Sequence, residues 1–305
     1  MADCLYAPYR GYYAGNIHSI GSRGDFTTAP QLSAIPAAAI AAWATGALRK
    51  HHARHLIEVG PGLGTLAKQV LGNLPLSLRL STRLHLVESS PKLAAHQKAL
   101  LKNKATYHPT ILDALAACSG NAVIYSNELV DAFPVRLFEK TETSWREIAV
   151  EKTNQGIREI LLPPATLPPS SVFNHQFPVG QRVEIHDSYR LWLESWLPHW
   201  NKGEMLTVDY GNPIETLYHR RPTGSLRAYL LHHRLEGLVI YQNPGLQDIT
   251  ADVNFTDLIQ WSAPWLKSQT LINFSDFTRP FYPETDARLS TAFQHFNCLI
   301  QTPRS

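Results

Sequence analysis

Three glycines spaced two residues apart, with an acid just before them, are the part of the sequence best suited to chemistry. The run Leu-Ile-Glu-Val-Gly-Pro-Gly-Leu-Gly contains Glu58, Gly60, Gly62 and Gly64. Because glycine has no Cβ, such a loop lets backbone N–H groups approach a ligand closely. The next apolar run ends at Glu88, and an acid at that place can bind ribose hydroxyls. These residues predict a nucleotide-cofactor pocket, with an ordinary tight turn as the alternative.

The spacing of the glycines favours one cofactor over another. It is Gly-x-Gly-x-Gly, whereas dinucleotide sites use Gly-x-Gly-x-x-Gly to pack a pyrophosphate onto a helix start. A sulfonium amino acid needs an acid for its ammonium group instead, and Glu58 can supply it. We therefore expect S-adenosyl-L-methionine as the cofactor.

A second group of polar residues follows a later apolar run, within Tyr-Ser-Asn-Glu-Leu-Val-Asp-Ala-Phe-Pro, and includes Asn127, Glu128 and Asp131. Methyl transfer to an amine or guanidinium requires that the acceptor nitrogen be held in line and lose a proton. Carboxylates and amide oxygens do both, so we expect Glu128 to hold and activate the acceptor, helped by Asn127 and Asp131. The alternative is that Asn127 and Asp131 cap a turn and a helix start.

The elements that must position these residues alternate in type. Apolar patterns predict strands at 55–59, 84–88, 105–107 and 122–126, and helices at 31–48, 65–71 and 91–101. Such alternation predicts an α/β fold with a parallel, doubly wound sheet. Ligands in these sheets bind at the carboxyl ends of the strands, where the glycine loop, Glu88 and Glu128 would meet.

The pattern changes after this region. Short alternating runs between 135 and 161 predict a β-meander, and many prolines follow; a helix is expected at 188–200 and a buried strand at 205–208. The runs at 226–230 and 271–274, with a helix at 255–261 between them, are expected to complete the sheet. We predict an N-terminal lid and helix (1–50), a cofactor-binding core (51–134 and 201–305) and a β-rich and helical insertion (135–200) that serves as a substrate or partner module.

The amino-acid composition of the chain narrows the classes of function that we expect for the protein. The 305 residues carry a net charge of +3 without a long single-sign block, which does not favour nucleic acid as a partner. Three cysteines far apart fit a reducing compartment. The histidine clusters His51-His52-His55 and His232-His233 lack a convincing third type of ligand, so no metal is expected. No signal peptide, transit peptide or membrane-spanning run is recognised, and we expect a cytoplasmic protein.

Many short motifs along the chain, in a fixed order, resemble one family. They are Leu5-Tyr6 with Pro8 and Gly11-Tyr12-Tyr13, Gly24-Asp25-Phe26-Thr27-Thr28-Ala29-Pro30, the glycine loop, Val87-Glu88-Ser89-Ser90-Pro91, Asn127-Glu128 with Asp131-Ala132-Phe133-Pro134-Val135, Asp209-Tyr210-Gly211, Leu226-Arg227-Ala228-Tyr229 and Pro244-Gly245 with Asp248-Ile249-Thr250. The chain resembles the MidA/NDUFAF7 family of S-adenosylmethionine-dependent methyltransferases over about Leu5 to Phe255. The resemblance implies a Rossmann-like class I methyltransferase sheet and a protein-arginine methyltransferase that assists assembly of respiratory complex I, so a respiratory-complex subunit is one candidate partner.

The resemblance also implies roles for further residues. Asp25 and Thr28 would lie in a loop over the cofactor, or simply in a capped turn, and Asp113 would bind the adenine amino group, or cap a helix that continues from Ala114. Four residues of the carboxyl half would line the acceptor side; they are Arg227, Tyr229, His233 and Asp248.

The chain departs from the family pattern in a short amino terminus and at Gln31, Ile35-Pro36 and Leu63. The change at Gln31 weakens the arginine assignment more than the cofactor assignment, because Glu58, Glu88 and Glu128 are retained. Two other readings therefore stay open. One is a non-catalytic assembly factor that works by binding a protein, and the other is a nicotinamide-dependent oxidoreductase, which Glu88 fits but the glycine spacing does not. The sequence leaves the oligomeric state open.

Overall fold

The computed structural model describes residues 1–13, 33–230, 233–281 and 293–304. The chain divides into two compact units that are both discontinuous in sequence. Unit 1 comprises Met1–Phe26, Val130–Trp192 and Gly211–Trp261, and unit 2 comprises Thr27–Leu129, Leu193–Tyr210 and Ser262–Ser305.

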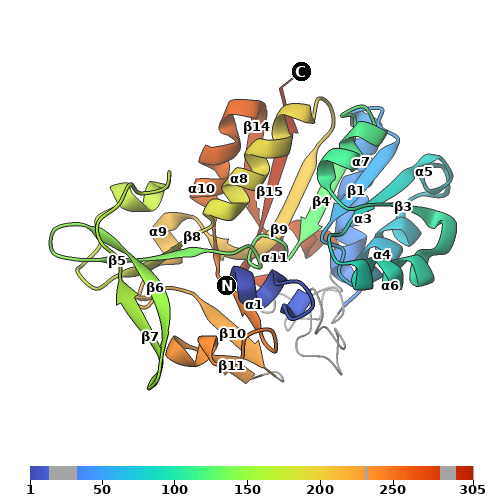
Figure 1. The fold of residues 1–305 in the computed structure, drawn as a ribbon. Coiled ribbons are helices and arrows are strands. Elements are labelled where there is room, and N and C mark those ends of the chain that lie inside the picture. The colour runs from blue at the N-terminus through green and yellow to red at the C-terminus, as the bar shows by residue number, and fades with distance from the viewer. Residues whose placement is uncertain (14–32, 231–232, 282–292, 305) are drawn as a thin grey trace. The chain divides into compact units, whose positions relative to one another are not determined.

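Unit 2 is built on the large sheet of the protein (Figure 1). Its continuous strand order is β14-β15-β9-β4-β1-β2-β3. The pairs from β9 through β3 are parallel, whereas β15 pairs antiparallel with both β9 and β14. The strands are β1 (His55–Val59), β2 (Arg83–Val87), β3 (Ala105–His108), β4 (Val123–Asn127), β9 (Met205–Asn212), β14 (Leu266–Asn273) and β15 (Phe296–Pro303).

Helices of unit 2 connect and cover these strands. They are α3 (Ile35–Lys50), α4 (Thr65–Asn73), α5 (Leu76–Ser81), α6 (Pro91–Leu101), α7 (Ile111–Ala117) and α11 (Phe274–Thr278). The alanine-rich α3 is buried along much of its length and packs with α4 in one core, against side chains such as Leu56, Val123 and Leu206 from the central strands. This core fixes β1 and β4 side by side, and their carboxyl ends carry the predicted site residues.

Local sequence signals explain where the helices around the site begin. Ser90 caps α6 by accepting a hydrogen bond from Leu93 N, and Pro91 occupies the first turn, where a missing N–H costs nothing. Thr110 caps α7 in the same way through Asp113 N. Both helices therefore start directly after the carboxyl ends of β2 and β3.

Unit 1 contains two smaller antiparallel sheets. One has the order β7-β6-β5-β8 and the other β11-β10-β12. The strands are β5 (Arg136–Lys140), β6 (Trp145–Thr153), β7 (Gly156–Leu161), β8 (Arg182–Ile185), β10 (Arg227–Leu230), β11 (His233–Leu235), β12 (Asp248–Thr250) and β13 (Val253–Asn254), the last pairing with the end of β9. Helices in the described part of unit 1 include α1 (Ala2–Tyr6), α9 (Ile214–Leu217) and α10 (Phe255–Ser262), and α8 (Asp187–Trp196) begins in unit 1 and ends in unit 2.

Most of the predicted elements are confirmed. The strand at 55–59 and the helix at 91–101 have the predicted bounds, and the meander forms as β5, β6 and β7 with β8 added. One expectation is wrong: the run at 226–230 does not complete the large sheet, because β10 pairs with β11 and β12 in unit 1. The run at 271–274 does contribute to the large sheet, through β14.

The compact units follow different bounds from the predicted domains. The segment 135–192 of the predicted insertion lies in unit 1 together with 211–261, which the sequence assigned to the core. The functional division into lid, core and insertion stays a prediction. Among the described residues, no helix has the length and apolar character required to cross a membrane.

Candidate functional site

The glycine loop joins β1 to α4 in backbone conformations that suit glycine. Gly60, Gly62 and Gly64 have φ values of +68°, +52° and +78°, in the left-handed region that side chains disfavour. Gly60 N donates to Val87 O at 3.0 Å, which ties the loop to the end of β2. The loop therefore turns sharply at the carboxyl edge of the sheet and leads into the helix start, the geometry of an anion- or nucleotide-binding turn.

Glu88 lies directly after β2, and its carboxylate accepts hydrogen bonds from the Ser89 and Ser90 backbone and from the Gln97 side chain. Its Oε1 accepts from Ser90 N at 2.8 Å and its Oε2 accepts from the side chain of Gln97 at 3.2 Å. Burial raises the pKa of Glu88, and these hydrogen bonds oppose that effect. Gln97 Nε2 also donates to Gly62 O at 2.7 Å, so one amide links the acid to the glycine loop.

Glu58 is buried, with 2% of its surface exposed, and Tyr125 OH donates to its Oε2 at 2.7 Å. Burial raises the pKa of Glu58 to about 8, although the hydrogen bond from Tyr125 lowers it. The pKa of Tyr125 is raised well above its ordinary value by burial and by Glu58. At neutral pH the pair is therefore uncharged in this structure, and binding a cofactor ammonium directly would require Glu58 to lose its proton.

Glu128 follows β4 with a φ of +50°, a strained conformation for a residue with a Cβ. Its N–H donates to Val208 O at 2.9 Å, and its Oε1 accepts from Asn127 Nδ2 at 3.0 Å. The fully buried Asp209 accepts from Leu129 N at 3.1 Å and from Tyr210 N at 2.9 Å, which fixes the turn after Glu128.

This turn lies next to the glycine loop. A Cβ added at Gly60 would stand 2.7 Å from Leu129 Cδ1. The structure thus brings Glu128 and the glycine loop to the same edge of the unit 2 sheet, as the sequence predicted from the convergence of strand ends.

Asp113 lies in the first turn of α7 and is exposed. Thr110 Oγ1 donates to its carboxylate at 2.6 Å, and Asp113 N donates back to Thr110 Oγ1 at 3.2 Å. This reciprocal pair is a helix-capping arrangement in which Thr110, rather than Asp113, is the N-cap. The predicted cofactor residues Asp25 and Thr28 lie outside the described residues.

Three of the predicted acceptor-side residues lie on two neighbouring strands of unit 1. Arg227 and Tyr229 occupy β10, and Asp248 on β12 is the cross-strand partner of Tyr229. Arg227 Nε donates to Tyr229 OH at 3.2 Å, and its guanidinium forms a buried ion pair with Asp252. Burial lowers the pKa of Arg227, but Asp252 and Tyr229 together raise it by more. Arg227 therefore stays charged and supports this sheet.

Asp248 accepts a hydrogen bond from Tyr13 OH at 2.7 Å. Burial raises the pKa of Tyr13 well above its ordinary value, and the charges of Asp248 and Asp131 raise it further. Asp131 lies in a turn that Phe133 N closes on Val130 O, and no helix begins there.

His233 is the acceptor-side candidate that lies apart from the others. It is exposed and pairs with Leu230, so it projects from the opposite face of its sheet to Tyr229. The structure does not bring it to the group formed by Arg227, Tyr229 and Asp248.

Three histidines lie side by side on neighbouring strands of the unit 2 sheet. His55 Nδ1 lies 2.9 Å from His85 Nε2, and His85 Nδ1 lies 2.9 Å from His108 Nε2, so the rings form a hydrogen-bonded row across three strands. Burial lowers the pKa of His85 to about 4 and keeps it neutral. Within the described ranges, no group of three or more His, Cys, Asp or Glu side chains is arranged to hold a metal ion; His232 lies outside those ranges.

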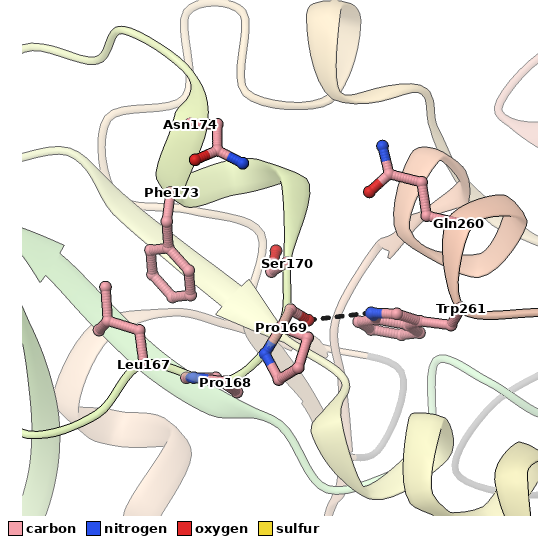
Figure 2. A pocket seen from close by; sticks show the side chains of 8 residues that line it. All are labelled: Leu167, Pro168, Pro169, Ser170, Phe173, Asn174, Gln260 and Trp261. Atoms are coloured by element: carbon pink, nitrogen blue, oxygen red, sulfur yellow. Dashed lines mark hydrogen bonds between the residues drawn. The ribbon is translucent and has the colours of Figure 1, made fainter.

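A groove of about 510 Å³ lies elsewhere, within unit 1 (Figure 2). It is formed by the proline-rich stretch, the 3-10 turn Ser171–Asn174 that follows it and the end of α10, and Trp261 Nε1 donates to Pro169 O at 2.9 Å. The groove contains none of the predicted site residues. The bond to Pro169 shows that this stretch is held against α10.

Three residues important to the site carried no assigned role in the sequence. Gln97 sits mid-helix, where a polar residue usually faces solvent, and Tyr125 belongs to an apolar strand. Asp209 was part of a recognised motif, and its position directly after a buried strand run was the available signal.

The residues at this edge fit S-adenosyl-L-methionine. Asn127 Oδ1 and Gln97 Oε1 are buried and have no hydrogen-bond partner among the described residues. Buried acceptors of this kind call for donors from a ligand or water. The hydroxyl and amino groups of the cofactor are such donors, and the glycine loop leaves its backbone open to close approach.

Comparison with known proteins agrees with this fit. The family model described as "Putative S-adenosyl-L-methionine-dependent methyltransferase" matches residues 39–271. The mitochondrial protein arginine methyltransferase NDUFAF7 of Xenopus tropicalis is 30% identical over 290 residues, which cover 84% of this chain and 64% of that protein. The human protein of the same name is 28% identical over 295 residues, with 85% and 63% covered. The chain thus spans slightly less than two thirds of the length of these curated relatives.

Two solved structures from Burkholderia thailandensis share the fold. One, a methyl-transferase candidate bound to S-adenosyl-homocysteine, has a TM-score of 0.81 at 24% identity and covers 99% of this chain and 86% of its own. The other has a TM-score of 0.79 at 25% identity, with 98% and 84% covered. The predicted class I methyltransferase fold is confirmed. The chain belongs to the MidA/NDUFAF7 family of S-adenosyl-L-methionine-dependent methyltransferases.

Proposed function

We propose that this protein transfers a methyl group from S-adenosyl-L-methionine to a side-chain nitrogen of a protein, with arginine as the acceptor. The observation that carries the proposal is the left-handed backbone of Glu128 beside the glycine loop. A left-handed backbone at a residue with a Cβ costs stability, and such strain persists where function requires the conformation. The names of the relatives support arginine.

The cofactor residues have separate proposed roles. Backbone groups of Gly60, Gly62 and Gly64 receive the cofactor, Glu88 accepts from its ribose hydroxyls, and Glu58 faces its ammonium end. Asp113, Asp25 and Thr28 complete the proposed set around the adenine and the loop above it. When bound, the cofactor supplies a methyl group on a positively charged sulfur and is left as S-adenosyl-homocysteine.

The residues of the protein itself act on the acceptor nitrogen, which they hold and deprotonate. A guanidinium nitrogen has no free lone pair until it loses a proton, so the new N–CH₃ bond requires a nearby base. Glu128 holds the guanidinium by charge-assisted hydrogen bonds and accepts that proton, while Asn127 orients the Glu128 carboxylate. Asp131, Arg227, Tyr229, His233 and Asp248 remain proposed residues of the acceptor side.

The acceptor is proposed to be a protein, and a respiratory-complex subunit is the first to test because of the family resemblance. Residues 135–200 are the proposed module for binding that partner. No metal is assigned a role.

Glu128→Gln tests the proposal, because glutamine keeps the shape of the side chain and cannot take the proton. The purified variant should bind S-adenosyl-homocysteine as the wild type does and lose at least about a hundredfold in turnover. Turnover is measured as transfer of isotope-labelled methyl groups into proteins of a total cell extract, followed by mass spectrometry of the labelled residues. Glu215→Gln is the matched control, because Glu215 is exposed and lies outside both the site and the proposed partner module.

Label on methylarginine that disappears in Glu128→Gln would support the proposal. Label on another side chain would refute arginine as the acceptor, and undiminished labelling by the variant would refute the role of Glu128. Wild-type protein that binds the cofactor product yet labels nothing would favour a non-catalytic assembly factor.

A further inference from the structure

The side chain of Gln97 connects the two parts of the cofactor site that come from different strands. It is fully buried on α6, and its single NH₂ group donates both to Gly62 O at 2.7 Å and to Glu88 Oε2 at 3.2 Å. We propose that Gln97 is the positioning residue of the cofactor site, fixing the Glu88 carboxylate against the glycine loop so that it binds the ribose diol. This inference rests on the proposed role of Glu88.

The orientation of the amide is determined by its partners. Gly62 O and Glu88 Oε2 can only accept hydrogen bonds, so the nitrogen of the amide must face them both. The oxygen then points elsewhere, and Gln97 Oε1 is indeed buried without a hydrogen-bond partner among the residues that the structure describes. A buried acceptor without a hydrogen-bond partner lowers the stability of the fold. A glutamine with a purely structural role would not need to leave its oxygen in that state.

Packing brings Gln97 close enough for this role. A Cβ added at Gly64 would stand 3.2 Å from Gln97 Cγ, so the loop lies directly on the glutamine stem. Tyr107 OH donates to Gln97 O at 3.1 Å and holds the backbone of α6 at this position. The amide is thus set by α6, β3 and the glycine loop together.

The effect on Glu88 follows from counting lone pairs. An ionised carboxylate has about four acceptor sites. Ser90 N uses one on Oε1, Gln97 Nε2 uses one on Oε2, and the Ser89 backbone also bonds to the carboxylate, so about one site remains for the ribose diol. Without Gln97, Glu88 Oε2 loses this donor, and the carboxylate can rotate so that the remaining site no longer faces the diol.

The experiment compares S-adenosyl-homocysteine with its 2′,3′-dideoxyribose analogue, which lacks both hydroxyls. Dissociation constants are measured calorimetrically for the wild type and Gln97→Met, which keeps a linear side chain of similar length without the donor. Gln97→Asn serves as a second variant, because its amide is too short to reach Glu88. His96→Gln is the matched control, since His96 is exposed on the same helix and has no part in the proposed site.

A hydrogen bond to a charged group is worth about 1.5–3 kcal/mol, so removing the hydroxyls should weaken wild-type binding by about tenfold to a hundredfold. In Gln97→Met and Gln97→Asn that ratio should fall toward one, because S-adenosyl-homocysteine loses affinity and the analogue does not. His96→Gln should keep the wild-type ratio.

Equal weakening of both ligands, with the ratio unchanged, would show a merely structural role and overturn the inference. Wild-type protein that binds both ligands equally would instead refute the role of Glu88 at the ribose. Wild-type protein that binds neither ligand would overturn the cofactor site itself, so the three failures are distinguishable.

Discussion

Replacing Glu58 by glutamine should make the protein more resistant to rising pH. The carboxyl of Glu58 is buried beside Tyr125, and burial raises its pKa from the ordinary 4.5 to about 8. In the unfolded chain the same carboxyl ionises near pH 4.5. Between these two pH values the unfolded state releases a proton that the folded state keeps, so folding becomes less favourable as pH rises.

The magnitude follows from the pKa interval. Each unit of difference between the folded and unfolded pKa corresponds to about 1.4 kcal/mol, so the wild type should lose up to about 5 kcal/mol between about pH 4.5 and 8 through this residue. At lower pH the carboxyl is protonated in both states and contributes no difference. The glutamine of the variant stays neutral in both states, and its amide oxygen can still accept the hydrogen bond from Tyr125.

The assay is urea-induced unfolding of the wild type and Glu58→Gln at several pH values from about 4.5 to 9. The stability of the variant relative to the wild type should rise by several kcal/mol across this range and level off above about pH 8. Glu142→Gln, at an exposed site, should show no such trend. A flat difference for Glu58→Gln would refute the neutral, buried carboxyl and with it the reasoning about Tyr125.

Two further substitutions test the backbone around the glycine loop. Gly60→Ala should lower the free energy of unfolding in urea by about 1–3 kcal/mol and weaken binding of S-adenosyl-homocysteine, because φ is +68° and the new methyl would lie 2.7 Å from Leu129. Gly72→Ala, in open space on α4, should be neutral or stabilising. Equal effects of the two substitutions would contradict this prediction. Asp209→Ala should lower the free energy of unfolding by about 2–4 kcal/mol, because the N–H groups of Leu129 and Tyr210 lose their buried acceptor. Asp209→Asn should lower it by less. Unfolding curves like that of the wild type for both variants would contradict the role of Asp209.

The sequence predicted the elements that carry their own local signals. The apolar run of β1 and the Ser-Pro start of α6 are sufficient to define these elements, and both match their predicted bounds. The strand β15 was not predicted, although it lies between β9 and β14. The sheet assigned to 226–230 was wrong, because alternation identifies a strand but not its partner.

In the candidate site, too, the sequence predicted local features but not contacts between residues far apart in the chain. Gly60 and Glu88 were placed at one edge by a general rule for parallel sheets, and the structure agrees. The role of Gln97 depends on α6 packing under the glycine loop, which is a tertiary contact that the local pattern does not contain. The neutral state of Glu58 likewise depends on burial beside Tyr125, which lies 67 residues away in the sequence.

The most direct test of the account is a calorimetric titration of the purified protein with S-adenosyl-L-methionine, repeated with Gly62→Val. Gly62 has a φ of +52°, so a β-branched side chain there should distort the loop that receives the cofactor. We expect one molecule of cofactor to bind to the wild type and binding to be lost in a variant that remains folded. Absence of wild-type binding, or equal affinity in both proteins, would contradict a cofactor site at the glycine loop.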